Sequence, residues 1–135
     1  MKFLLDHNLP PALARALNEL SKADGHNVYP LRDRFAPETS DQCWIRVLKA
    51  EGDWIVISQD RFIKGDTERQ AFRTSGIPVF CLARQWAAET YWSKAHNLIR
   101  WWPAIVQQSS LIKGGAGFKI SWRYSPPGKF EQLKI

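Results

Sequence analysis

The sequence predicts an α/β fold, in which three layers, α/β/α, are built around a central and mostly parallel sheet of four strands. Short apolar segments alternate with segments whose apolar residues recur at helical spacing, an order typical of parallel β-α-β units. The clearest strand, residues 54–58, is rich in β-branched and apolar residues, as expected of a strand covered on both faces. A chain of 135 residues suits one domain and can bury a core without disulfides.

The strands and the first helices can be placed from these patterns. Strands are expected at residues 2–5, 26–29, 54–58 and 77–81. The first helix should follow Pro10 and Pro11, because a first helical turn needs no amide donor. Its apolar residues at helical spacing are Leu13, Leu17 and Leu20. A second helix is expected at residues 40–51 and a short third helix at residues 66–74.

A long helix is expected at residues 84–108, with a kink at Pro103. Its buried stripe should consist of Tyr91, Ala95, Leu98, Trp102 and Ile105. Two further aromatic residues, Trp92 and Trp101, lie outside this stripe. They could leave an apolar patch for a partner helix or for a second copy of the chain, so a homodimer is one expected assembly.

The C-terminal extension, residues 111–135, is expected to pack on the domain formed by residues 1–110. Glycines within residues 114–117 predict the turn of a β-hairpin between residues 111–112 and 118–124. Basic residues of the extension are interleaved with aromatic ones: Lys113, Lys119, Arg123, Lys129 and Lys134 with Phe118, Trp122, Tyr124 and Phe130. This mixture suits single-stranded nucleic acid, but it suits an interface or a core-covering hairpin equally well.

The charge and the cysteines narrow the class of protein. The formal net charge is +6, which favours polyanionic partners such as nucleic acid, or alternatively an acidic protein. Cys43 and Cys81 form no C-x-x-C motif, which disfavours a thiolate zinc site and fits a reducing compartment. No apolar run reaches membrane-spanning length. The sequence therefore predicts a cytoplasmic protein that acts without a membrane.

Three aspartates are predicted to meet at one edge of the sheet. Asp6 ends the first strand, Asp60 ends the third strand, and Asp41 opens the helix before that third strand. In right-handed parallel units all three lie at the same edge, where neighbouring strand ends are about 5 Å apart. Because clustered carboxylates repel one another, they need a cation or the protonation of one acid. Mg²⁺ or Mn²⁺ prefers such oxygen ligands and often binds substrate phosphates as well.

A metal of this kind beside a basic surface indicates phosphodiester hydrolysis. Arg61 and Lys64 follow the third strand closely and could hold the phosphates that flank the scissile one. Arg32 and Arg34 occur in a loop that is predicted at the same edge, so they are further candidates for binding RNA phosphates.

Each candidate residue also has a purely structural interpretation. Asp41 could serve only as an acid at the start of its helix, and Asp60 could serve only to cap a turn. Asn8 could cap the helix that follows the first strand. His7 could be a general base or a metal ligand, but a strand neighbour of Asp6 should point elsewhere. A half-buried histidine bonded to the backbone is therefore the favoured interpretation.

Two stretches, FLLDHNLPPALARAL and SDQCWIRVLKAEGDWIVISQDR, resemble the PIN-like domain family, and more narrowly its compact branch grouped with VapC-type toxins. The resemblance runs from Met1 to about Leu82. It implies a PIN-like α/β sandwich and a metal-dependent ribonuclease whose catalytic metal ligands are Asp6, Asp41 and Asp60. Many proteins of this kind are toxins neutralised by a cognate antitoxin, so RNA and an antitoxin are the expected partners.

The resemblance also assigns one supporting residue and leaves one position open. Asn8 matches a polar position usual in the compact branch, where it would support the metal ligands. The acid that other PIN domains carry in a middle helix has no clear counterpart here, and the candidates to substitute for it are Asp33, Glu38 and Glu68. In other branches of the family, domains that lack one or more of these acids can have lost nuclease activity.

Two other functions fit parts of the sequence. A phosphoacceptor receiver domain also carries acids after its first and third strands. It normally has two adjacent acids at the first site, where this chain reads Asp6-His7-Asn8, and a lysine turn that has no counterpart after residues 77–81. The other alternative is a non-catalytic module that binds RNA or a partner protein without cutting.

Overall fold

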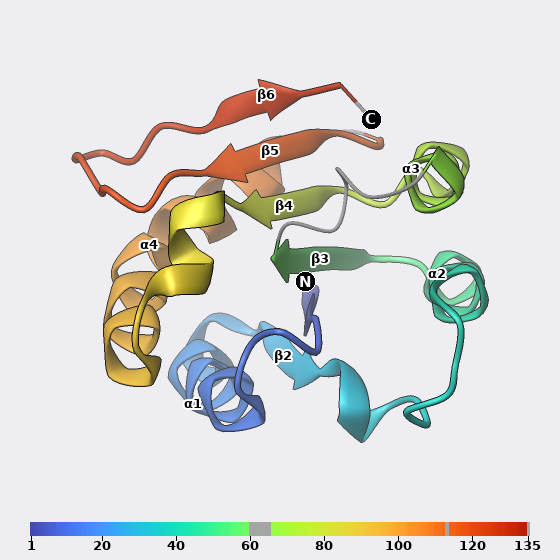
Figure 1. The fold of residues 1–135 in the computed structure, drawn as a ribbon, viewed down its shortest axis with the longest axis horizontal. Coiled ribbons are helices and arrows are strands. Elements are labelled where there is room, and N and C mark those ends of the chain that lie inside the picture. The colour runs from blue at the N-terminus through green and yellow to red at the C-terminus, as the bar shows by residue number, and fades with distance from the viewer. Residues whose placement is uncertain (60–65, 113, 135) are drawn as a thin grey trace.

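The structure, a computed structural model, describes residues 1–59, 66–112 and 114–134 (Figure 1). Within these residues one six-stranded sheet runs in the order β2-β1-β3-β4-β5-β6. Its strands are β1 (Lys2–Leu5), β2 (Asn27–Pro30), β3 (Trp54–Gln59), β4 (Val79–Leu82), β5 (Gly117–Ile120) and β6 (Glu131–Leu133). The helices are α1 (Pro11–Ser21), α2 (Asp41–Glu51), α3 (Asp66–Ser75) and α4 (Tyr91–Leu111). Short 3₁₀ turns are η1 (Lys22–Asp24), η2 (Leu31–Asp33) and η3 (Arg84–Ala88).

The α/β class and the mostly parallel sheet are confirmed, but the predicted number of strands is wrong. Strands β1 to β5 pair in parallel, and β6 pairs antiparallel with β5. The sheet therefore has two strands more than the four predicted. The predicted hairpin strand at residues 111–112 is also wrong, because Leu111 is the last residue of α4. β5 pairs instead with β4, and its antiparallel partner β6 follows residues 121–130.

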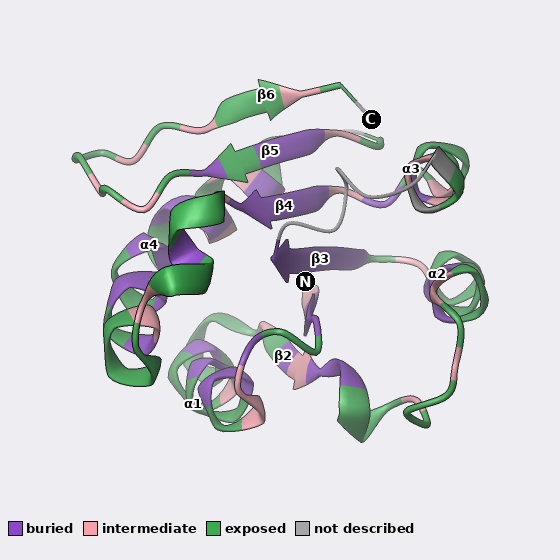
Figure 2. Ribbon diagram, in the orientation of Figure 1, coloured by how far each residue is buried: buried purple, intermediate pink, exposed green. Residues whose placement is uncertain are grey.

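Helices cover both faces of the sheet, with α1 and α4 on one side and α2 and α3 on the other (Figure 1). Because side chains alternate along a strand, β1 contributes to both layers. Phe3 and Leu5 pack with residues of α1 and α4, whereas Leu4 packs with residues of α2 and α3. Figure 2 shows that β3 is buried along its length, which confirms the expectation of a strand covered on both faces.

The starts of α1 and α2 follow from local chemistry. The Oγ of Ser40 accepts a hydrogen bond from the backbone N–H of Cys43 at 3.2 Å, so Ser40 caps α2 and Asp41 is its first helical residue. Pro10 is the N-cap residue of α1 and makes no side-chain cap bond. The cap by Asn8, one of its two expected roles, is therefore wrong, because the N-cap residue is Pro10 and the side chain of Asn8 bonds to the carbonyl oxygen of Gln59 instead.

The predicted helix at residues 84–108 is two elements, η3 and α4, which meet at Thr90. The Oγ1 of this residue accepts a hydrogen bond from the backbone N–H of Ser93 at 3.3 Å and starts α4. Tyr91, expected in the buried stripe, is 47% exposed. Trp101, expected at the surface, is 1% exposed because the C-terminal segment covers it: the ring of Tyr124 lies 5.0 Å away.

The C-terminal segment completes the core on the α1 and α4 side of the sheet. Trp86 donates a hydrogen bond from Nε1 to the carbonyl oxygen of Ile120 at 3.0 Å, which ties η3 to β5. The ring of Phe118 stacks on that of Phe80 at 5.3 Å, and Phe130 contacts both rings. Residues 117–133 thus share one sheet and one core with the elements before them.

Candidate active site

Asp6 lies at the carboxyl end of β1 and is only 2% exposed. Its backbone N–H donates to the carbonyl oxygen of Ile57 at 3.0 Å, so the pairing of β1 with β3 continues to this residue. The Oγ of Ser58 donates to Oδ2 of Asp6 at 2.8 Å, and the backbone N–H of His7 donates to Oδ1 at 2.6 Å. A buried carboxylate is thereby held in one orientation at the edge of the sheet by charge-assisted hydrogen bonds.

Ser58 is the residue of this site that the sequence analysis missed. It is 2% exposed and, by strand alternation, lies on the same face of β3 as Val56, toward the layer of α2 and α3. The signal was present in the sequence, because Ser58 and Gln59 are polar residues that end an otherwise apolar strand. Polar side chains at that position need partners, and Asp6 on the neighbouring strand is the partner of Ser58.

Asn8 and Gln59 tie the loop after β1 to the end of β3. The Nδ2 of Asn8 donates to the carbonyl oxygen of Gln59 at 3.4 Å, and the side chain of Asn8 is exposed. Gln59 is 6% exposed, and its Oε1 is buried without a hydrogen-bond partner among the described residues. Asn8 therefore supports the backbone beside Asp6. His7 is exposed and contributes its backbone N–H to Asp6.

Asp41 lies at the start of α2, at the same edge and on the same side of the sheet as Asp6. Its Oδ1 accepts a hydrogen bond from Nε1 of Trp44 at 2.8 Å. α2 packs against Leu4 and Val56, which share a face with Asp6. Gly52 and Asp53 connect the last turn of α2 to the amino end of β3. The first turn of α2 therefore lies toward the carboxyl end of β3, which is also where Asp6 lies.

The third predicted acid, Asp60, lies outside the described residues, as do Arg61 and Lys64. Within residues 1–59, 66–112 and 114–134, no group of three His, Cys, Asp or Glu side chains is placed to hold a metal ion. The donors that the structure does describe, two carboxylates at one sheet edge, suit a hard divalent cation in type. A complete ligand set would need a further donor, and Asp60, the residue after β3 in the sequence, lies outside the described residues.

Of the three candidates for the missing middle acid, Asp33 and Glu38 are exposed, and the side chain of Glu68 lies outside the described residues. Asp33 accepts a hydrogen bond from Nη2 of Arg15 at 2.9 Å, so its carboxylate is paired with α1. Glu38 is exposed in the loop before α2. The side chain of Glu68, on α3, lies outside the described residues.

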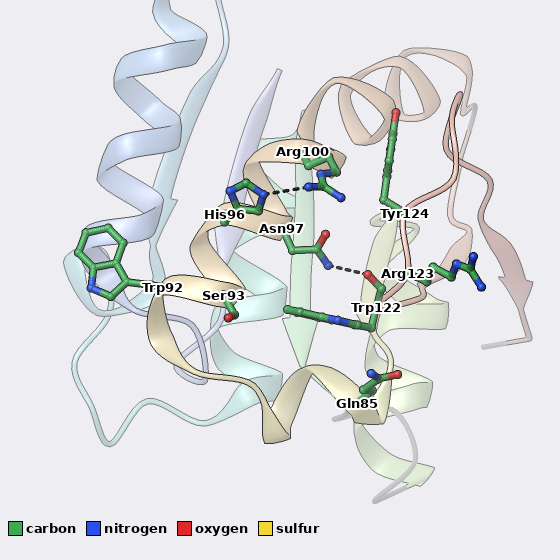
Figure 3. A pocket seen from close by; sticks show the side chains of 9 residues that line it. All are labelled: Gln85, Trp92, Ser93, His96, Asn97, Arg100, Trp122, Arg123 and Tyr124. Atoms are coloured by element: carbon green, nitrogen blue, oxygen red, sulfur yellow. Dashed lines mark hydrogen bonds between the residues drawn. The ribbon is translucent and has the colours of Figure 1, made fainter.

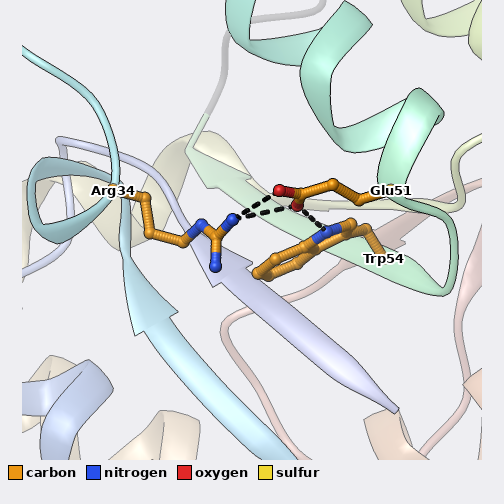
Figure 4. Close-up of polar contacts among 3 residues, drawn as sticks. All are labelled: Arg34, Glu51 and Trp54. Carbon is orange, nitrogen blue, oxygen red and sulfur yellow. Dashed lines mark hydrogen bonds and ion pairs between the residues drawn. The ribbon is translucent and has the colours of Figure 1, made fainter.

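Of the two loop arginines, Arg32 is exposed in η2, and Arg34 is held in a cluster at the amino end of β3 (Figure 4). The Nη2 of Arg34 donates to both carboxylate oxygens of Glu51, at 2.9 and 2.7 Å. Its guanidinium lies 4.9 Å from the ring centroid of Trp54, whose Nε1 also donates to Glu51, at 2.8 Å. Trp54 begins β3 and Asp6 lies beside its far end, about 15 Å of strand away.

No helix within the described residues combines the length and the apolarity needed to cross a lipid bilayer.

Comparison with known proteins finds one informative match. A family model described as "PIN like domain" matches residues 1–84, which is more than half of the chain. The matched part contains β1 to β4 and Asp6, Asp41 and Asp60, whereas α4, β5 and β6 lie beyond it. Neither the curated proteins nor the solved structures yield a match to the chain.

Proposed function

Because this chain belongs to the PIN-like domain family, whose members are commonly nucleases, we propose that it is a metal-dependent endoribonuclease. The single observation that carries the proposal is the buried carboxylate of Asp6, held by Ser58 at the carboxyl edge of a parallel sheet. That edge is where open α/β sheets bind their ligands. A carboxylate that is buried and held in one orientation at this edge is the kind of ligand that a hard divalent cation would bind.

In this proposal Asp6, Asp41 and Asp60 would hold Mg²⁺ or Mn²⁺. The bound ion would supply an activated water and stabilise the leaving oxygen of the phosphodiester. Ser58 and the N–H of His7 orient the Asp6 carboxylate, and Asn8 holds the loop after β1 against the end of β3. Arg61, Lys64 and Arg32 would bind flanking phosphates. A phosphate at Arg34 would compete with Glu51 for the guanidinium.

The first test is cleavage of an RNA oligonucleotide by the purified protein. We expect cutting with Mg²⁺ or Mn²⁺ and none in excess chelator. Asp6→Asn and Asp60→Asn should each reduce the rate by more than about 100-fold, because each removes a charged metal ligand. Asp53→Asn is a matched control, since Asp53 is exposed at the amino edge of β3 and asparagine tolerates its positive φ of 63°. Wild-type cleavage by Asp60→Asn would contradict the assignment.

We further propose that the protein is the toxin of a toxin–antitoxin pair and that an antitoxin protein neutralises it. The net charge of +6 supports an acidic partner as well as RNA. Expression of the protein should arrest growth, and co-expression of the adjacent reading frame should relieve the arrest. Normal growth on expression of a protein that cleaves RNA in vitro would argue against the toxin role while leaving the nuclease intact.

The second candidate function is a non-catalytic module that binds RNA. It is supported by the net charge of +6 and by the basic and aromatic residues of the C-terminal segment, which suit RNA binding without cleavage. This alternative predicts salt-sensitive binding of RNA with no turnover under any metal. Chelator would then leave RNA binding unchanged.

A further inference from the structure

A cavity of about 810 Å³ lies between the first half of α4 and the segment that follows β5 (Figure 3). One wall carries Trp92, His96 and Arg100 from α4, and the other carries Trp122, Arg123 and Tyr124. Its size is within the range of sites that bind small ligands or parts of larger ones. The matched family region ends at residue 84, so both walls belong to the part of the chain beyond it.

The two walls are fixed to each other by buried contacts. The Nδ2 of Asn97 donates to the carbonyl oxygen of Trp122 at 2.6 Å, across the floor of the cavity. The ring of Trp122 packs edge-on against Trp86 at 4.7 Å, and Tyr124 packs edge-on against Trp101 at 5.0 Å. The cavity is therefore a preformed feature of the fold, built on rigid elements.

The lining of this cavity combines positive charge with aromatic surface. The Nη2 of Arg100 lies 2.9 Å from the Nε2 of His96, both on α4. Arg123 is exposed on the opposite wall. Among the described residues that line the cavity, none is an aspartate or a glutamate. Trp92 is 79% exposed, an unusual state for a tryptophan, and Figure 3 shows its ring projecting from the start of α4 at the outer margin of the cavity, away from Trp122 and Tyr124. Exposed aromatic rings beside arginines are the features that bind the bases and phosphates of single strands.

β5, which leads into one wall of the cavity, ends at the same edge of the sheet as β1, although the cavity lies on the α4 side and the Asp6 carboxylate on the α2 side. Trp122 follows β5 by two residues, as Asp6 directly follows β1, and both strands run in the same direction. Between them lie β3 and β4, so the two strand ends are three strand spacings apart, about 14 Å. A single strand of a few nucleotides can span that distance.

We propose that this cavity is an anchoring site for single-stranded RNA, in which Arg100 and Arg123 bind phosphates and Trp92 and Tyr124 stack on bases. The inference rests on the proposed function in one respect, namely that the anchored strand is the substrate of the Asp6 site. Anchoring outside the acid site would lower KM for long RNA and leave the chemical step on a short substrate unchanged. An acidic peptide is the other occupant compatible with the arginines, but exposed tryptophan surface favours bases.

Binding is measured with a fluorescent 12-nucleotide oligouridylate in excess chelator, using the Asp6→Asn chain so that cleavage cannot interfere. Trp92→Leu should weaken binding about 5- to 150-fold through lost stacking, and Trp92→Phe should restore most of it. Arg100→Ala and Arg123→Ala should each weaken binding and lower the slope of log K against log salt by about 0.7. Arg46→Ala, an exposed arginine on α2 across the sheet, is the matched control.

The outcomes separate this inference from the nuclease proposal. Binding that depends on Trp92, Arg100 and Arg123 in a chain that never cuts RNA would support the cavity and reject the nuclease. RNA cleavage with wild-type KM in all three variants would reject the cavity and support the nuclease. Tighter binding of polyglutamate than of RNA at this cavity would also overturn the proposal, because the occupant would then be an acidic protein segment.

Discussion

The hydroxyl of Ser58 donates a hydrogen bond to the carboxylate of Asp6 at 2.8 Å, between the carboxyl ends of β3 and β1. Both side chains are 2% exposed. The contact joins residues 52 positions apart in sequence, so it forms only when the two strands pair in the observed register. It places a fixed, buried carboxylate at the edge where the metal site is proposed.

Ser58→Ala should lower the free energy of unfolding by about 1–3 kcal/mol, because the buried carboxylate loses a hydrogen-bond donor. Urea denaturation measures the change. Ser110→Ala is the control, since Ser110 is exposed on α4 and its substitution should cost less than about 0.5 kcal/mol. Equal stability of Ser58→Ala and wild type would mean that the hydrogen bond contributes nothing to holding Asp6.

Asp41 has both a structural and a metal-binding interpretation, and two substitutions separate them. Asp41→Asn keeps an acceptor oxygen for Nε1 of Trp44, so stability should change by less than about 1 kcal/mol. Cleavage should nevertheless fall by more than about 100-fold if the carboxylate binds the metal.

Asp41→Ala removes the acceptor as well and should cost about 1–2 kcal/mol of stability, because the indole N–H of Trp44 is left without it. Denaturation and cleavage assays on the same preparations give both quantities. Full cleavage activity in Asp41→Asn would mean that Asp41 does not bind the metal and serves only as an acidic residue at the start of α2.

Arg34 and Arg32 are predicted to differ in what their loss costs. Arg34→Ala should lower stability by about 1 kcal/mol, because it removes the half-exposed ion pair with Glu51 and the contact with the Trp54 ring. Arg32→Ala should leave stability unchanged and raise KM for RNA if this exposed arginine binds a phosphate. A larger rise of KM in Arg34→Ala than in Arg32→Ala would show that Arg34 leaves its ion pair with Glu51 to bind RNA.

Removal of residues 111–135 should prevent cooperative folding of the remaining chain. The deletion takes away β5 and β6, exposes the Phe80 ring and leaves the Nε1 of the fully buried Trp86 without its acceptor. Loss of the Tyr124 ring would also uncover Trp101. Thermal unfolding followed by circular dichroism measures this, with full-length protein as the control. A sharp transition in residues 1–110 alone would establish them as an independent domain.

Much of the site's location could be predicted from the sequence because it depends on local patterns. Alternating strand and helix signals are enough to place Asp6 after a strand and Asp41 at a helix start, and parallel β-α-β geometry then puts both at one edge. The donor that orients Asp6 could not be predicted in the same way. Ser58 reaches Asp6 because β1 and β3 are neighbours in a particular register, which the local pattern does not specify.

The same limit explains the errors at the C-terminus. The apolar spacing of α4 does not distinguish Trp92 from Trp101, yet the first is 79% exposed and the second 1% exposed. The difference arises because Tyr124 and Phe130 cover Trp101 from a distant segment. β5 has four residues and a weak signal, so its place beside β4 is decided by packing and not by propensity.

Local sequence patterns are sufficient to predict the α/β class, the order of the elements through β4 and the edge at which Asp6 and Asp41 lie. Periodicity, helix-start residues and the handedness of parallel units act over short stretches of chain, and those stretches contain the necessary information. Tertiary packing decided that β5 and β6 join the sheet and that Ser58 is the partner of Asp6. It also decided that the Arg34 guanidinium lies at the amino edge of the sheet and that a cavity forms between α4 and Trp122. Each of these depends on which distant segments pack together, a choice made by the total burial and hydrogen bonding of the folded chain.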